Sequence, residues 1–172
     1  IKLCARYGIP HISTGDMLRQ QVASASPLGL KVKSILDSGA LVTDDVIMQV
    51  VEARLSQPDC KKGFLLDGIP RTLGQAESLS ALLLKMGLPK LSVVQINVPD
   101  NVLLERIQNR AGESSRSDDT AEVAAKRLQV YRDQTAPVAG FYEAQSCLVK
   151  VDGVGTVDEV LGRVAAALEG VR

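Results

Sequence analysis

The sequence is poor in aromatic residues, with no Trp, three Tyr and two Phe among its 172 residues. Proteins that bind single-stranded nucleic acid without sequence preference stack bases on aromatic side chains, so this class is disfavoured. An excess of one charge is also lacking, because 20 Lys and Arg residues balance 20 Asp and Glu residues. The composition therefore gives no electrostatic argument for a nucleic-acid or membrane-surface partner.

Long apolar runs and paired cysteines are missing as well. No run approaches the ~20 apolar residues that span a bilayer, so we expect no membrane partner. Cys4, Cys60 and Cys147 form no C-x-x-C pair, which favours a reducing compartment and argues against a zinc site. We expect a cytoplasmic protein, or an organellar one if a transit peptide precedes Ile1.

The sequence does contain an alternation of short apolar strands and amphipathic helices. Strands are predicted at residues 11–13, 64–66, 92–98 and 147–151, and helices at 1–7, 14–23, 26–38, 43–55, 72–86, 100–111, 118–136 and 156–169. Apolar rather than alternating strands indicate an α/β fold with a parallel sheet that helices cover on both faces. Open sheets of this kind bind ligands at the carboxyl ends of their strands.

The first strand is followed by the segment 13–19, STGDMLR. A glycine at a helix start lets backbone N–H groups approach an anion, and Arg19 lies one turn further on, where its guanidinium could contact a phosphate. A capped surface helix that carries an arginine by chance would have the same sequence features. This segment alone is therefore a weak indication of phosphate binding.

The second strand is followed by the segment 67–72, DGIPRT, with Gln75 one turn into the next helix. Asp67 suits the water shell of a magnesium ion, Gly68 admits a ligand against the backbone, and the rigid Ile-Pro step aims Arg71 into the crevice. The alternative is a Gly-Pro turn with solvated ends. Read together with segment 13–19, segment 67–72 strongly indicates an anion site.

Four arginines make a third group. Arg106 and Arg110 share one helix face, Arg116 lies in a polar loop, and Arg127 lies in the following helix. Asp118 and Asp119 sit among them. A cationic flap that closes over a polyphosphate needs such acids to hold its arginines when the ligand is absent. A solvated surface is the simpler alternative.

In this order, the segments 8–19, 67–72 and 116–119 resemble the adenylate kinases of the nucleoside monophosphate kinase family, over about residues 7–168. The resemblance implies a P-loop kinase fold with a core of residues 1–13, 57–111 and 119–172, a helical AMP-binding insert at 14–56 and a short lid at 112–118. That lid has no cysteine, so no lid zinc is expected.

The resemblance also implies a role for each matching residue. The implied AMP ligands are Thr14, Arg19, Leu41, Val42, Gly68, Arg71, Gln75, Arg116 and Arg127, with Arg19 and Arg71 on the α-phosphate and Gln75 on the adenine edge. The implied ATP site comprises Arg106, Arg110, Gly153, Val154 and Gly155, with Arg106 stacked on the base. The implied catalytic groups, which neutralise the transferring phosphoryl, are Arg71, Arg110, Arg116 and Arg127.

Three acids have supporting roles in the resembled family. By this resemblance, Asp67 is expected to orient the magnesium ion through water rather than by a direct bond, and Asp118 and Asp119 are expected to order the lid. Phosphoryl transfer needs positioned anions and neutralised charge rather than a protein nucleophile, so His11 is interpreted as structural.

The implied function is Mg²⁺-dependent, reversible phosphoryl transfer from ATP to AMP, which gives two ADP, by a monomer whose partners are ATP, AMP and ADP. Two alternatives stay open. One is a related kinase that acts on another nucleoside monophosphate, and the other is a nucleotide-binding protein without catalytic activity.

One family feature is absent from the sequence. No G-x-x-x-x-G-K-[ST] phosphate loop occurs in the 172 residues, and in the resembled family this loop lies just upstream of the helix that contains Ile1. We therefore expect a natural protein longer by ~20 residues or more. We also expect a sheet without its middle strand, and no kinase activity from the chain as given.

Overall fold

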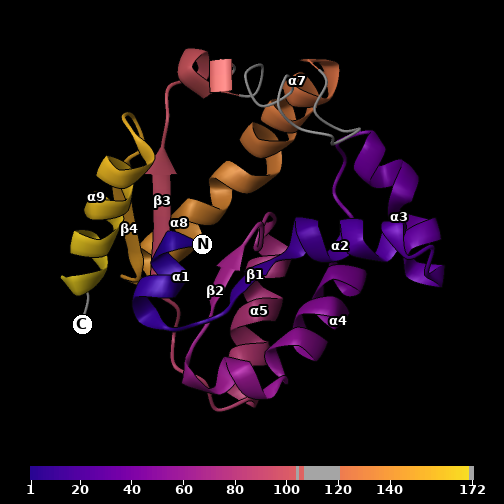
Figure 1. Cartoon of the computed structure of the whole chain (residues 1–172), viewed down its shortest axis with the longest axis horizontal. Helices are drawn as coiled ribbons and strands as arrows, with labels where there is room; N and C mark the ends of the chain where they lie inside the picture. Colours follow the sequence, from indigo (N-terminus) through magenta and orange to yellow (C-terminus); the bar gives the residue numbers. More distant parts are fainter. Residues whose placement is uncertain (104, 107–120, 171–172) are drawn as a thin grey trace.

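The computed structural model describes residues 1–103, 105–106 and 121–170. Its strands are β1 His11–Ser13, β2 Leu65–Asp67, β3 Val93–Asn97 and β4 Leu148–Asp152. β1 pairs in parallel with β2, and β3 pairs in parallel with β4, so these strands form two separate sheets (Figure 1). Parallel strands were predicted at these places, and the structure confirms them.

Helices begin and end close to their predicted limits. They are α1 Lys2–Tyr7, α2 Thr14–Ala23, α3 Pro27–Asp37, α4 Asp44–Leu55, α5 Leu73–Lys85 and α9 Val157–Glu169. The 3₁₀ turn η1 Pro58–Lys62 was not predicted. The side-chain oxygens of Ser13, Ser26, Thr72 and Thr156 each accept a backbone N–H of the following first turn. Ser13, Ser26 and Thr156 stand at the predicted starts of the helices 14–23, 26–38 and 156–169, so the structure confirms these helix starts.

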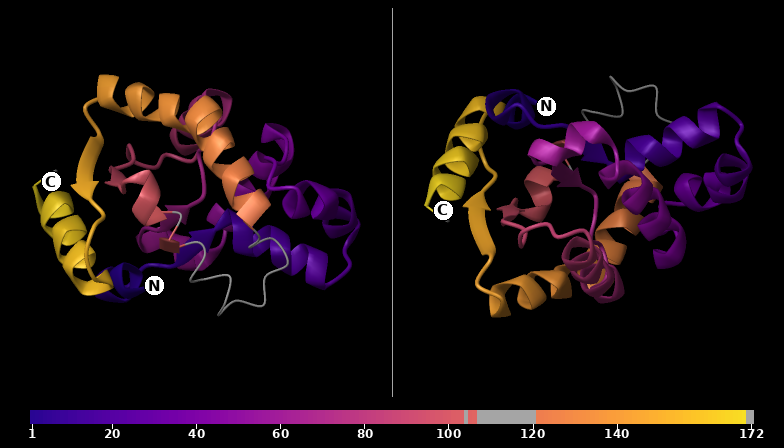
Figure 2. Two further views of the ribbon diagram at one scale, coloured as in Figure 1. Left: turned by 90° about the horizontal axis from the view of Figure 1, so that it is seen from above. Right: turned by 90° about the horizontal axis from the view of Figure 1, so that it is seen from below.

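The predicted end of a helix before Pro137 is wrong. α7 Ala121–Val130 continues through a π-helical turn, η2 Tyr131–Thr135, into α8 Ala136–Ala144, and Figure 2 shows one continuous helical run. Pro137 lies in the first turn of α8, after the change of hydrogen-bond pattern, where its missing N–H costs little. The remainder of the predicted helix 100–111 beyond residue 106, and the predicted lid at 112–118, lie outside the described residues.

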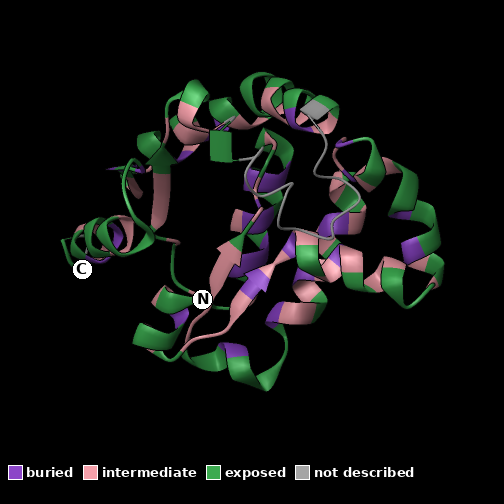
Figure 3. Ribbon diagram, turned by 45° about the horizontal axis from the view of Figure 1, so that its top comes forward, coloured by how far each residue is buried: buried purple, intermediate pink, exposed green. Residues whose placement is uncertain are grey.

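The main hydrophobic core lies between the predicted insert and α5. Ile12 of β1, Val51 of α4 and Leu79 of α5 are its most completely buried members. A smaller cluster joins Ala76 of α5 to Val138 and Tyr142 of α8. In Figure 3 the buried residues gather around β1 and α5. Because α5 contributes Leu79 to the first cluster and Ala76 to the second, it links the two strand pairs. In the described part of the chain, no helix is long and apolar enough to cross a membrane.

Candidate functional site

A cavity of about 300 Å³ lies at the carboxyl ends of β1 and β2. The turn after β2, the start of α2, the loop before α4 and one side chain of α7 form its walls. The lining residues are Ser13, Thr14, Gly15, Asp16, Leu18, Arg19, Leu36, Gly39, Ala40, Leu41, Val42, Ile47, Asp67, Gly68, Arg71, Gln75 and Arg127. This is the strand edge at which the sequence predicts a ligand.

The turn after β2 positions Arg71. Gly68 adopts a left-handed backbone conformation with φ of 78°, and its carbonyl oxygen accepts hydrogen bonds from Arg71 Nε at 2.8 Å and Thr14 Oγ1 at 3.0 Å. A Cβ at this position would lie 2.9 Å from Arg71 Nη2 and 3.0 Å from Thr14 Oγ1. Glycine is therefore required both by the backbone angle and by the close approach of two cavity side chains.

Three arginines converge on the cavity from different elements. Arg19 comes from α2, Arg71 from the turn after β2, and Arg127 from α7. Partial desolvation in the cavity lowers the pKa of Arg71 below its usual value, as do Arg127 and, more weakly, Arg19, whereas Asp67 raises it. Like charges held this close favour an anionic ligand, and a phosphate group suits the planar guanidinium.

Asp67 is the acid at the end of β2. Its Oδ2 lies 3.1 Å from His11 Nε2, on the neighbouring strand. The carboxylate remains exposed, which fits a magnesium ion that keeps its water shell and is held chiefly through substrate phosphates. Within the described residues, no group of three or more His, Cys, Asp or Glu side chains could hold a metal directly.

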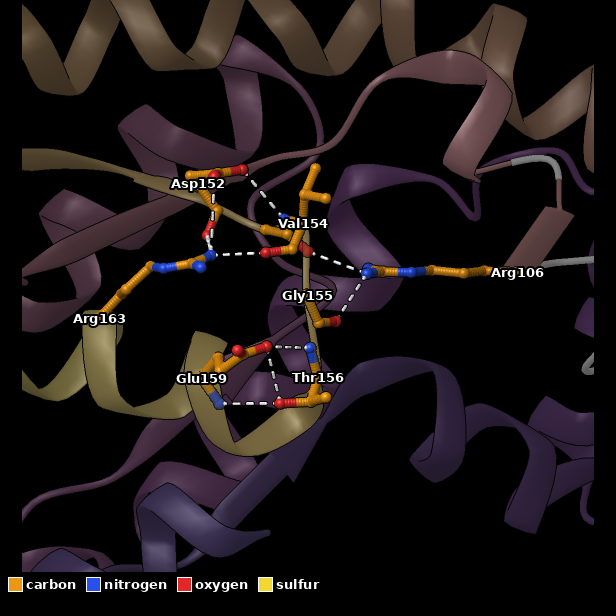
Figure 4. Close-up of polar contacts among 8 residues, drawn as sticks. Arg106, Asp152, Val154, Gly155, Thr156, Glu159 and Arg163 are labelled. Carbon is orange, nitrogen blue, oxygen red and sulfur yellow. Dashed lines mark hydrogen bonds and ion pairs between the residues drawn. The ribbon is translucent and has the colours of Figure 1, made fainter.

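A second cluster surrounds the loop between β4 and α9 (Figure 4). Arg106 Nη2 donates to the carbonyl oxygens of Gly153 at 2.9 Å and Gly155 at 3.3 Å. From α9, Arg163 Nη1 donates to the carbonyl oxygens of Asp152 at 3.0 Å and Val154 at 2.6 Å. Two guanidinium groups therefore hold this loop, one on each side.

The structure brings most of the predicted site residues together. All the implied AMP ligands in the described residues line the cavity, and Arg106 contacts the implied ATP-base loop 153–155. Arg110, Arg116, Asp118 and Asp119 lie outside the described residues, and the individual roles stay predictions.

Sequence reasoning missed two residues. Asp44 contacts Gln75, and Arg163 holds the loop at Asp152 and Val154. Asp44 falls within the predicted helix 43–55 without a predicted role, and Arg163 carries no sequence signal beyond its charge.

Comparison with known proteins points to one family. A family model described as adenylate kinase matches residues 1–147. An adenylate kinase from Xanthomonas oryzae pv. oryzae (strain MAFF 311018) is 55% identical over 162 residues, which are 94% of this chain and 87% of that protein. An adenylate kinase from Stenotrophomonas maltophilia (strain R551-3) is 49% identical over 169 residues, 98% of this chain and 90% of that protein.

Proposed function

Because this chain belongs to the adenylate kinase family, we propose that its arginine-lined cavity holds the acceptor AMP during phosphoryl transfer from ATP. The observation that supports this proposal best is the convergence of Arg19, Arg71 and Arg127 on one cavity at the strand ends. The reaction gives two ADP and is reversible.

The cavity offers the chemistry that phosphoryl transfer requires. The protein must place two anions in line and neutralise charge on the moving group, with no nucleophile of its own. Arg71 and Arg19 bind the AMP phosphate, while Arg127, with Arg110 and Arg116, neutralises the transferring group. A bound Mg²⁺ supplies positive charge at the phosphate oxygens of ATP, and Asp67 holds its water shell.

Arg106 and the loop 153–155 form the proposed ATP-base site. The two carbonyl contacts fix the edge of the Arg106 guanidinium. Its planar face can then stack on an adenine ring.

The proposed base specificity is adenine. Thr14 and Gln75 are the buried polar side chains of the cavity, and Leu41 and Val42 supply its apolar wall. Calorimetric titration of the 172-residue chain should show AMP binding at least about tenfold tighter than CMP or UMP, because a pocket built to hydrogen-bond one base leaves polar groups unpaired with another. Equal or tighter binding of CMP would contradict the adenine assignment.

We further propose that the 172 residues alone do not turn over ATP and AMP. The motif that cradles the ATP phosphates is absent from the sequence, so Arg106 and the loop 153–155 could bind the base without orienting the γ-phosphate. The test compares ADP formation by this chain with that of a version extended at its N-terminus by a segment that carries a G-x-x-x-x-G-K-[ST] phosphate loop. Full turnover by the 172-residue chain would refute this proposal without affecting the AMP-binding titration.

A further inference from the structure

We propose that Asp44 is a specificity-determining positioning residue that fixes the side-chain amide of Gln75 in the orientation that pairs with adenine. This inference rests on the proposed AMP site. It concerns a residue that does not line the cavity and that acts through Gln75.

Asp44, the first residue of α4, reaches across to the start of α5. Its Oδ1 accepts a hydrogen bond from Gln75 Nε2 at 2.8 Å, and its Oδ2 accepts one from Thr72 Oγ1 at 3.0 Å. Gln75 is only 3% exposed, so its amide has little access to competing water. A helix of the predicted insert thereby holds a buried side chain of the core.

The two partners of the Gln75 amide determine its orientation. A carboxylate can only accept, so the NH₂ group must face Asp44. On the other side, the backbone N–H of Arg71 can only donate, and it contacts Gln75 Oε1 at 2.8 Å. A flipped amide would place oxygen against carboxylate and NH₂ against N–H, so both hydrogen bonds would be lost in a buried site.

The fixed amide keeps one N–H and one oxygen lone pair for a ligand. Adenine presents an amino donor beside a ring-nitrogen acceptor, which matches this pair. Hypoxanthine presents a carbonyl oxygen in place of the amino group, so its oxygen would face Gln75 Oε1. An amide that cannot flip should therefore distinguish AMP from IMP, two ligands with the same ribose and phosphate.

The experiment measures the ratio of AMP to IMP affinity by calorimetry in the 172-residue chain and its variants. We expect Asp44→Ala to lower this ratio about tenfold, because the Arg71 N–H alone then holds the amide against turning. Asp44→Asn should keep the ratio within threefold, since its oxygen can accept from Gln75 and its NH₂ can donate to Thr72 Oγ1. Asp45→Ala is the matched control, since Asp45 is an exposed acid of the same helix turn.

A second variant displaces the carboxylate without removing its charge. A Cβ at Gly74 would lie 2.9 Å from Asp44 Oδ2, and alanine suits the helix α5 better than glycine. Gly74→Ala should therefore also lower the AMP to IMP ratio, which keeps the test decisive if Asp44→Ala does not fold.

The outcomes separate this inference from the proposed function. A wild-type ratio in Asp44→Ala and Gly74→Ala would overturn the role of Asp44, even if both ligands bound more weakly, because a merely structural role lowers both affinities together. Failure of the wild-type chain to bind AMP would instead overturn the AMP site itself.

Discussion

Arg71 carries its charge in surroundings that disfavour it. Desolvation in the cavity, Arg127 and Arg19 each lower the pKa of its guanidinium. When folding lowers the pKa of a base, the folded state favours the neutral form of that base. The charged guanidinium therefore destabilises the folded chain at every pH below the lowered pKa, and the physiological pH range lies below it. Arg71 is also accessible to solvent through the open cavity, which weakens this repulsion.

We therefore predict that Arg71→Met weakens AMP binding without reducing stability. Loss of a charge-assisted contact to phosphate should cost about 1.5–3 kcal/mol, or roughly 10- to 100-fold in affinity. The melting temperature should stay the same or rise slightly, since Gly68 O keeps its hydrogen bond from Thr14 Oγ1. Calorimetry and thermal unfolding of the same variant check both parts, and a strongly lowered melting temperature would show that Arg71 is structural.

Gly68 allows a matched comparison with Gly87. Both adopt left-handed conformations, with φ of 78° and 67°, but a Cβ at Gly87 would meet nothing within 4 Å. Replacing either by Ala should cost about 1–2 kcal/mol for the backbone alone. Gly68→Ala should cost more and should also weaken AMP binding several-fold, because its Cβ crowds Arg71 and Thr14. If the two variants bind AMP equally well, the crowding at Gly68 has no functional effect.

At the scale of elements, the start of α9 fixes the end of the loop 153–155. Thr156 and Glu159 form a reciprocal capping box, in which Glu159 Oε2 accepts from Thr156 N at 2.7 Å and from Thr156 Oγ1 at 2.9 Å. These hydrogen bonds, first of all the one from the backbone N–H, lower the pKa of Glu159 below its usual 4.5. The anchored helix carries Arg163, which holds Asp152 and Val154 (Figure 4).

The capping box predicts a defined pH dependence. Because folding lowers the pKa of Glu159, its stabilising contribution is present above the unfolded value of 4.5 and is lost as the pH falls through the folded pKa. The stability difference between the wild type and Glu159→Gln should therefore be largest near neutral pH and should shrink in acid. Urea unfolding at several pH values measures it, with Glu77→Gln, at an exposed position of α5, as control. A difference that is constant with pH would contradict the charged cap.

At the scale of the whole molecule, the pair β1–β2 lies against the main hydrophobic core, whereas the pair β3–β4 leaves part of its apolar surface exposed. The cavity residues Leu18, Val42 and Ile47 belong to the main hydrophobic cluster, so the cavity walls continue into the main core. In β3, Ile96 is 49% exposed despite its place in a strand. β4 is the one described strand that pairs with β3, so the other edge of β3 has no ladder partner among the described residues.

We predict that amide exchange is slower around the cavity than in β3. Backbone amides of α4 and α5 near Val51 and Leu79 should be the most protected, because opening them exposes fully buried apolar side chains. Amides of β3 at residues 94–96 should exchange sooner, and AMP should increase protection around the cavity alone. Hydrogen exchange read by mass spectrometry tests this, and equal protection of β3 and α5 would contradict the expected difference in local stability.

Local sequence determined much of this protein. The strands and the helix starts at Ser13, Ser26 and Thr156 depend on neighbouring residues, so the spacing of residue types was enough to predict them. The sequence also predicted that Arg19 and Arg71 would share a site, because parallel strands end at the same edge.

Tertiary structure alone decided the contacts between distant residues. Asp44 and Gln75 are 31 positions apart, and their hydrogen bond exists because α4 packs against α5. Arg106 reaches Gly153 across 47 positions. The continuation of the helix through Pro137 likewise depends on a π-helical turn that no residue pattern predicted. Periodicity specifies which face of an element is buried, but the partner across that face depends on how the elements pack, and that packing fixes the orientation of Gln75.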